Sequence, residues 1–221
     1  MKYEKFTYKK NEASKKISIS IENPEEYHRY IAGIVENVKV QDSPKWLKDR
    51  LESIGQRSIN NIVDISNYVM MEMGQPTHIF DFDKIGSDKI QIRKSTKGES
   101  ITTLDETKRE LRGRELLITN GQRPIAVAGI MGGLNSAVTT ETKTVVIESA
   151  YFDPPTIRKG AKALNMSSDA SKRFERGTDI NATESAFWMI IKLLEKYAKG
   201  KWVPGIIDEY PQKYKLNKIN V

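Results

Sequence analysis

Apolar and polar residues alternate near the start of the chain, and this pattern predicts strands. Residues 17–21 read ISISI, and residues 29–40 form a longer apolar run, RYIAGIVENVKV. A period of two is typical of a strand that buries one face. We expect the folded part to begin here, after a flexible, lysine-rich lead-in over residues 1–16.

Two helices are predicted between residues 43 and 73. Ser43 would be the N-cap of the first, Pro44 its first helical residue and Gly55 its stop. The second would start after Ser58 and run to about Met73. The apolar positions at helical spacing are Leu47, Leu51 and Ile54 in the first helix, and Ile62, Val69 and Met73 in the second.

The second helix also carries an unusual polar face, formed by Asn60, Asp64 and Asn67. Asparagine and aspartate form helices poorly, so propensity does not explain this choice. Two interpretations stay open: these side chains bind neighbouring loops, or they form a polar wall near a ligand.

The sequence pattern of the rest of the chain predicts strands followed by helices. A loop containing His78 leads into KIQIRK at 89–94, a hairpin is suggested over 101–111, and Asn120-Gly121 between apolar runs is a strong hairpin signal. TVVIESAYF (144–152) predicts a buried strand. Two further helices are predicted, one starting at Asp153 and one with Asn181 and Glu184 in capping-box spacing and Gly200 as its stop. Together these elements predict one α+β domain with a mixed sheet, hairpins and flanking helices.

Composition narrows the class of protein. The chain has 221 residues and no cysteine, so there is no disulfide framework and no thiolate metal site, which suits a cytoplasmic protein. No apolar run approaches the roughly 20 residues of a membrane span. The net charge of +7 favours a polyanionic partner such as RNA, although a basic surface can also serve solubility alone.

His78 is one of only two histidines, and it precedes Asp81 and Asp83. A metal site is disfavoured, because His28 is distant in sequence and cysteine is absent. A structural histidine and a site histidine remain as alternatives.

Two further features are candidates for binding chemistry. Gly129, Gly132 and Gly133 follow a strand, where exposed amides can cradle an oxygen atom, or where a strained turn alone needs glycine. Glu148 lies in an apolar strand, so it needs either an arginine partner or a donor on a ligand.

Basic residues gather after the last predicted strand. They form a candidate phosphate-contacting patch, or else a solvated helix face. The candidate phosphate-contacting residues are Arg158, Lys159, Lys162, Lys172 and Arg173.

Three blocks of the sequence resemble the B3/B4 domain of the bacterial phenylalanyl-tRNA synthetase β subunit. They are RSINNIVDISNYVMMEMGQPTHIFDFDKI, PIAVAGIMGGLNSAVTTETKTVVIESAYFDP and SSDASKRFERGTDI, in the family's order and spacing. The resemblance covers residues 17–210, and residues 211–221 would begin a linker to a following domain. It implies an α+β fold whose cleft hydrolyses tyrosine wrongly esterified to the phenylalanine tRNA.

The resemblance also implies roles for single residues. His78, Glu148 and Gly129 would be catalytic, and Ser66, Ala128, Ser168 and Ala170 would bind substrate. Asn67, from the polar face of the second helix, joins the predicted substrate-binding residues. Ser66 and Ser168 stand where the family commonly has threonine. No serine or cysteine nucleophile is evident, so water would attack the ester directly.

The implied partners are tRNA(Phe) and the α subunit of the synthetase heterotetramer. Editing would need no cofactor, whereas the ATP and magnesium used by the full synthetase have no site in this chain. A noncatalytic tRNA-positioning module and a hydrolase acting on other aminoacyl or peptidyl esters are the rival interpretations.

Overall fold

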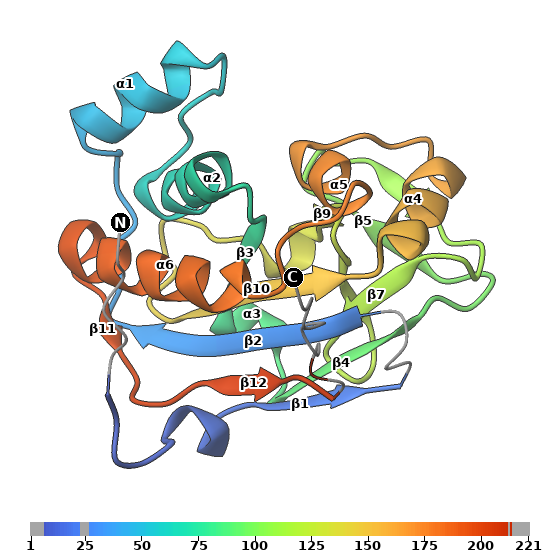
Figure 1. Cartoon of the computed structure of the whole chain (residues 1–221), viewed down its shortest axis with the longest axis horizontal. Helices are drawn as coiled ribbons and strands as arrows, with labels where there is room; N and C mark the ends of the chain where they lie inside the picture. The colour runs from blue at the N-terminus through green and yellow to red at the C-terminus, as the bar shows by residue number, and fades with distance from the viewer. Residues whose placement is uncertain (1–6, 23–26, 212, 214–221) are drawn as a thin grey trace, which may run out of the picture.

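The computed structural model describes residues 7–22, 27–211 and 213. Two five-stranded sheets lie against each other, and helices cover the outer face of one of them (Figure 1). The helices are α1 (Lys45–Ser53), α2 (Asn61–Met73), α3 (Phe82–Ile85), α4 (Pro154–Ala163), α5 (Asp169–Phe174) and α6 (Ala182–Ala198), with short 3-10 turns at Ala13–Lys15 and Leu134–Ser136.

The first sheet is mixed, with the strand order β1-β4-β7-β8-β9. Only its β1–β4 pair is parallel. A separate hairpin pairs β5 (Ser100–Thr102) with β6 (Lys108–Glu110), as predicted. The strands of the first sheet are β1 (Ser18–Ile21), β4 (Lys89–Lys94), β7 (Leu116–Thr119), β8 (Pro124–Val127) and β9 (Met131–Gly132).

The second sheet is wholly antiparallel, with the order β11-β2-β10-β3 and with β12 also paired to β2. The α+β class is therefore confirmed, with this sheet in addition to the expected mixed one. Its strands are β2 (Tyr27–Glu36), β3 (Thr77–Asp81), β10 (Val145–Phe152), β11 (Lys201–Trp202) and β12 (Ile207–Glu209).

Strand β10 is the centre of the molecule, because it is buried on both faces. Val145 and Ile147 pack with α2 and α6, whereas Val146 and Ala150 belong to the core shared with the first sheet. This double burial explains why the strand reads as a continuous apolar run. Glu148 has the same parity as Val146 and Ala150, so it points into the space between the two sheets.

Helix α1 differs from its prediction at its start, whereas Gly55 (φ +78°) is its stop as predicted. Pro44 is the N-cap, in extended conformation, and the Ser43 hydroxyl donates instead to Asp64 Oδ2 at 2.5 Å. Ile54, expected in the apolar stripe, is 55% exposed, because the helix ends at Ser53. Leu47 and Leu51 are buried as predicted.

The polar face of α2 holds neighbouring loops, one of the two interpretations left open. The Asn60 side chain accepts hydrogen bonds from the amides of Ile62 and Val63, both at 3.0 Å, and so caps the helix. Asp64 is fully buried and accepts from the Ser58 hydroxyl at 2.6 Å.

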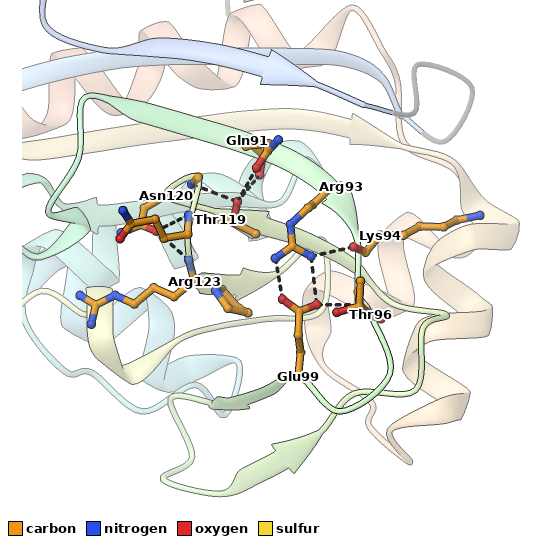
Figure 2. Close-up of polar contacts among 12 residues, drawn as sticks. Gln91, Arg93, Lys94, Thr96, Glu99, Thr119, Asn120 and Arg123 are labelled. Carbon is orange, nitrogen blue, oxygen red and sulfur yellow. Dashed lines mark hydrogen bonds and ion pairs between the residues drawn. The ribbon is translucent and has the colours of Figure 1, made fainter.

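The Asn120-Gly121 hairpin is confirmed, with its polar contacts drawn in Figure 2. Asn120 Oδ1 accepts from the amides of Gln122 and Arg123 at 3.1 and 2.9 Å, and its Nδ2 donates to the Ile85 carbonyl at 2.8 Å. A single asparagine thus closes the turn and fixes it to α3.

Of the caps predicted for α4 and α6, only the one of α4 is confirmed at the helix start. Asp153 caps α4 by accepting from the Thr156 amide at 2.9 Å, as predicted. The capping box predicted for α6 is wrong: Asn181 has helical dihedral angles and no side-chain cap, and Glu184 lies 3.5 Å from Arg29. The helix ends at Ala198, and its C-cap Lys199 has left-handed conformation (φ 55°), one residue before the expected Gly200.

Part of the stretch 1–16, which was predicted to be a flexible lead-in, packs against the rest of the domain. Asn11 Nδ2 donates to the Ile206 carbonyl at 2.6 Å, and Ala13 is fully buried. Residues 1–6 of the expected lead-in, and most of the expected linker at 211–221, lie outside the described residues. None of the helices in the described ranges has the length and apolar character of a membrane span.

Candidate functional site

A pocket of about 80 Å³ lies between the two sheets, next to α5. Strands β3 and β10 form one wall, and the turn between β8 and β9 forms the opposite one. The lining includes His78, Gly129, Gly132, Glu148, Ala170 and Phe174.

Glu148 is the acidic group of this pocket, and its side chain is almost removed from water. The residue is 5% exposed, and burial raises the pKa of its carboxyl to about 8, although a hydrogen bond from Tyr30 acts in the opposite direction. Glu148 is therefore mostly neutral at pH 7, with one oxygen that can donate and one that can accept.

The partner of Glu148 is not an arginine but the phenol of Tyr30. Tyr30 is fully buried, and its hydroxyl donates to Glu148 Oε2 at 3.2 Å. In the β2–β10 ladder Tyr30 faces Ala150, and Glu148 faces Ala32, so the two side chains are diagonal neighbours on one face of the sheet. The sequence carried no signal for this contact beyond the phase of Tyr30 in an apolar strand, because 118 residues separate the partners.

His78 lies on strand β3 and not in a loop, which corrects the prediction. In the β3–β10 ladder it stands directly opposite Glu148, so both side chains leave the sheet on the pocket side. Its ring packs edge-on against Phe80 at 4.4 Å between centroids. Burial lowers the pKa of His78 to about 4, so the imidazole is neutral at pH 7.

Gly132 leaves room for the His78 ring. A Cβ atom at this position would lie 2.5 Å from His78 Cε1 and 2.7 Å from Nε2, closer than atoms can approach. The glycine requirement at this position is therefore steric.

Gly129 has two reasons to be glycine, which are its φ of +66° and its close neighbours. A Cβ atom there would lie 2.9 Å from Ile157 Cδ1. The amides on either side are occupied, since Ala128 donates to Leu116 and Ile130 donates to Val127. The Gly129 amide has no hydrogen-bond partner among the described residues, and Gly129 is part of the pocket lining.

Ala170 forms the pocket wall from α5, and Ser168 holds that helix in place. The Ser168 hydroxyl donates to the Ile130 carbonyl at 2.7 Å and accepts from the Ser171 amide at 3.0 Å. Ser168 therefore joins α5 to the turn that contains Gly129, and its oxygen is already used inside the protein.

Three other residues that were predicted to bind substrate do not line the pocket. The Ser66 hydroxyl donates to the Thr77 carbonyl at 3.0 Å, which fixes α2 to β3 beside His78. Ala128 is 1% exposed, and Asn67 is partly exposed on α2. The structure thus brings His78, Gly129, Glu148 and Ala170 together, and leaves Ser66, Asn67, Ala128 and Ser168 outside.

Asp81, which follows His78 in the sequence, belongs to the scaffold. It caps α3 by accepting from the amides of Asp83 and Lys84, and it accepts from the Thr142 hydroxyl at 2.5 Å. The other histidine, His28, packs edge-on against Tyr151. In the described part of the chain, no three acidic or histidine side chains gather as possible metal ligands.

The opposed pKa values of His78 and Glu148 give a pH dependence of stability. Between pH 4.5 and 6.5 the contributions of the two groups to the pH dependence of the free energy of unfolding have opposite signs. The reason is that folding raises the pKa of Glu148 from 4.5 and lowers that of His78 from 6.5. From pH 6.5 to about 8 only Glu148 acts: the unfolded chain has released its proton and the folded chain has kept it. The free energy of unfolding should therefore fall by about 1.4 kcal/mol per pH unit over this window.

Urea unfolding at pH 6.5, 7.2 and 8.0 measures this slope in the unaltered chain and in Glu148→Gln. The variant should lose this contribution to the slope, because glutamine does not titrate. Equal slopes in the two proteins would show that Glu148 is ionised throughout this range.

The five basic residues of the predicted patch have different contacts. Arg158 donates to the Glu175 carbonyl at 2.9 Å, and Arg173 lies 3.4 Å from Asp169. Lys172 is exposed on α5. Lys159 and Lys162 line a different hollow, on the far side of α4.

Known proteins resemble this chain over most of its length. A family model described as the B3/4 domain matches residues 26–199. The phenylalanine–tRNA ligase beta subunit of Bacillus cereus is 48% identical over 192 residues, covering 87% of this chain and 24% of that protein. The same subunit of Thermotoga maritima is 45% identical over 201 residues, covering 91% of this chain and 26% of that protein. The chain thus spans about a quarter of the length of these curated relatives.

A solved structure shares the fold. It is the crystal structure of an N-terminal fragment of the phenylalanyl-tRNA synthetase beta subunit from Pyrococcus horikoshii. The TM-score is 0.54 at 16% sequence identity, and the match covers 89% of this chain and 52% of the fragment.

Proposed function

The chain belongs to the B3/4 domain family, and on this premise we propose that it hydrolyses the ester of tyrosine wrongly attached to the phenylalanine tRNA. The observation that supports this most is the buried acid Glu148, which Tyr30 holds in a pocket shared with a neutral histidine. Membership of the family does not depend on this proposal.

Glu148 would recognise the tyrosine hydroxyl by a hydrogen bond. Because Tyr30 donates to Oε2, the proton of the neutral acid resides on Oε1, which can donate to a phenolic oxygen. A phenylalanine side chain would leave this buried donor without a partner, at a cost of roughly 1–3 kcal/mol. An apolar pocket rejects an added hydroxyl only by about 10², so a second site that requires the hydroxyl complements it.

The other residues of the pocket would serve the ester. With a pKa of about 4, His78 is a weak base at neutral pH, so we assign it the orientation of water through a hydrogen bond. The Gly129 amide would donate to the oxyanion that develops when water adds to the carbonyl carbon. The C–O ester bond then breaks, and tyrosine leaves together with a tRNA that has regained its hydroxyl.

A deacylation assay tests the proposal directly. Incubation of the 221-residue chain with tyrosyl-tRNA(Phe) and phenylalanyl-tRNA(Phe) should release tyrosine selectively. No release from either would favour a noncatalytic tRNA-positioning role, and equal release from both would favour a general esterase. In a whole synthetase this domain would act beside an α subunit and an aminoacylation site located elsewhere.

Tyr30→Phe tests whether the phenol orients Glu148. The variant loses only the hydroxyl, so we expect the preference for tyrosyl over phenylalanyl ester to fall about tenfold. The pH limit of that preference should also move upward, because the Tyr30 hydrogen bond lowers the pKa of Glu148. Rates at pH 6–9 measure both effects, and Tyr151→Phe on the same sheet is the matched control. An unchanged preference and an unchanged pH limit would remove Tyr30 from this role.

A further inference from the structure

A second hollow lies on the other side of α4 from the pocket. It has a volume of about 670 Å³. Its lining combines the end of β4, the loop before β7 and one face of α4: Lys94, Arg112, Gly113, Arg114, Thr156, Lys159, Lys162 and Ala163.

The five cations of this basic groove (Lys94, Arg112, Arg114, Lys159 and Lys162) are all exposed. The described residues include no carboxylate within ion-pair distance of Arg112, Arg114, Lys159 or Lys162. Exposed cations of α1, by contrast, are paired, Lys45 with Asp49 at 2.6 Å and Lys48 with Glu52 at 3.8 Å. The groove therefore concentrates the positive charge of these four groove side chains, which the described residues do not neutralise.

The loop that carries Arg112 and Arg114 is built around an internal carboxylate. Glu115 is fully buried, and its Oε2 accepts from the Ser95 hydroxyl at 2.6 Å and from the amides of Arg112 and Arg114 at 3.0 and 3.1 Å. Glu115 thus fixes the backbone of the loop from beneath. Both arginine side chains stay free of it.

The β4 end is fixed in the same manner. Arg93 and Glu99 form a two-pronged ion pair, and Glu99 also accepts from the Thr96 amide at 2.6 Å. Figure 2 shows the Lys94 side chain extending away from this network. Adjacent residues of a strand point to opposite faces, which separates Lys94 from the paired Arg93.

Helix α4 connects the groove to the pocket. Ile157 packs against Gly129 at the pocket wall, and Gly160 fits closely against Ile130 and Glu115. Lys159 and Lys162 leave the same helix on its exposed side. A helix with its side chains is about 10 Å across, so the groove begins roughly that distance from the pocket wall.

We propose that the basic groove binds the phosphate backbone of RNA, and that it carries the strand whose end enters the pocket. This inference rests on the proposed function for its choice of RNA. The described lining residues include no aromatic side chain on which a base could stack, so the contacts would be electrostatic and independent of sequence.

Paired substitutions test the groove from both sides. Lys159→Gln with Lys162→Gln alters the α4 side, and Arg112→Gln with Arg114→Gln alters the loop side while keeping the amides that bind Glu115. Lys45→Gln with Lys48→Gln on α1 is the control, since it removes the same charge from a distant exposed helix (Figure 1). Circular dichroism confirms that each variant folds.

Binding of deacylated tRNA(Phe) is measured from 50 to 300 mM salt. Each groove pair should weaken binding on the order of tenfold at 50 mM and reduce the slope of log K against log salt by about two, whereas the control keeps the original slope within about 0.5. Groove variants that bind like the control would overturn the proposal. So would a selective effect of inorganic phosphate, if it displaced tRNA better than chloride at equal ionic strength, because the groove would then be a site for the free ion.

Hydrolysis of tyrosyl-tRNA(Phe) by the unaltered chain reports separately on the proposed function. If the groove pairs lose tRNA binding while the unaltered chain releases no tyrosine, the groove stands and the editing activity fails. If tyrosine is released while the groove pairs bind like the control, the reverse holds.

Discussion

Ala170→Trp should abolish ester hydrolysis while the domain stays folded. Ala170 lies in the first turn of α5 and lines the pocket, whose volume is about 80 Å³. An indole in that space would displace the aromatic ring of the substrate, and an ester carbon moved by even about 1 Å can lose on the order of 100-fold in rate. The rate of tyrosine release from tyrosyl-tRNA(Phe) is the measurement.

Two controls separate blocking from misfolding. Ala170→Ser adds one small atom and should retain activity within a few-fold. Circular dichroism and thermal unfolding should be nearly unchanged in both variants, because Ala170 is partly exposed. Full hydrolysis by a folded Ala170→Trp protein would place the reaction outside this pocket.

Glu148→Ala should reduce the preference for tyrosyl over phenylalanyl ester by roughly 100-fold. The change deletes the group that meets the phenol and also leaves the Tyr30 hydroxyl without its acceptor. Loss of one hydrogen bond between buried groups, with its partner left unpaired, costs roughly 1–3 kcal/mol, which corresponds to this range. Single-turnover deacylation of both esters gives the ratio.

Glu148→Gln makes the experiment sharper. Glutamine has the shape of the neutral acid, with a carbonyl that can accept from Tyr30 and an N–H that can donate to the phenol. Because burial raises the pKa of Glu148 to about 8, the Gln variant should keep most of the preference at pH 7. If it instead behaves like the Ala variant, Glu148 acts as an ionised acceptor, and a preference unchanged in both variants would exclude it from recognition.

Helices and turns that depend on near neighbours could be predicted from the sequence. The N-cap at Asp153 and the Asn120 turn are confirmed, since a cap or a tight turn is decided by contacts within about four residues. Predictions failed where a distant group competed for the same side chain. Ser43 could cap α1 but bonds Asp64 on α2, and Glu184 could close a capping box but faces Arg29 on β2.

The residues of the candidate site could also be predicted only in part from the sequence. The sequence blocks that resemble the B3/B4 family marked His78, Gly129, Glu148 and Ala170, and these four line one pocket. The same blocks also marked Ser66 and Ser168, whose hydroxyls hold the scaffold together. A motif fixes which residues recur together, but it does not state whether a side chain faces the pocket or the wall behind it.

The sequence by itself determined the class of fold, the kinship and the local elements, because apolar periodicity and capping are properties of short segments. Only the tertiary structure decided that His78 stands opposite Glu148 across two strands, and that Tyr30 reaches Glu148 from a third. It also decided that Arg112 and Arg114 join Lys159 and Lys162 around one groove. Strand order and register create these neighbours, and a one-residue shift in register would turn each of these strand side chains to the opposite face of its sheet.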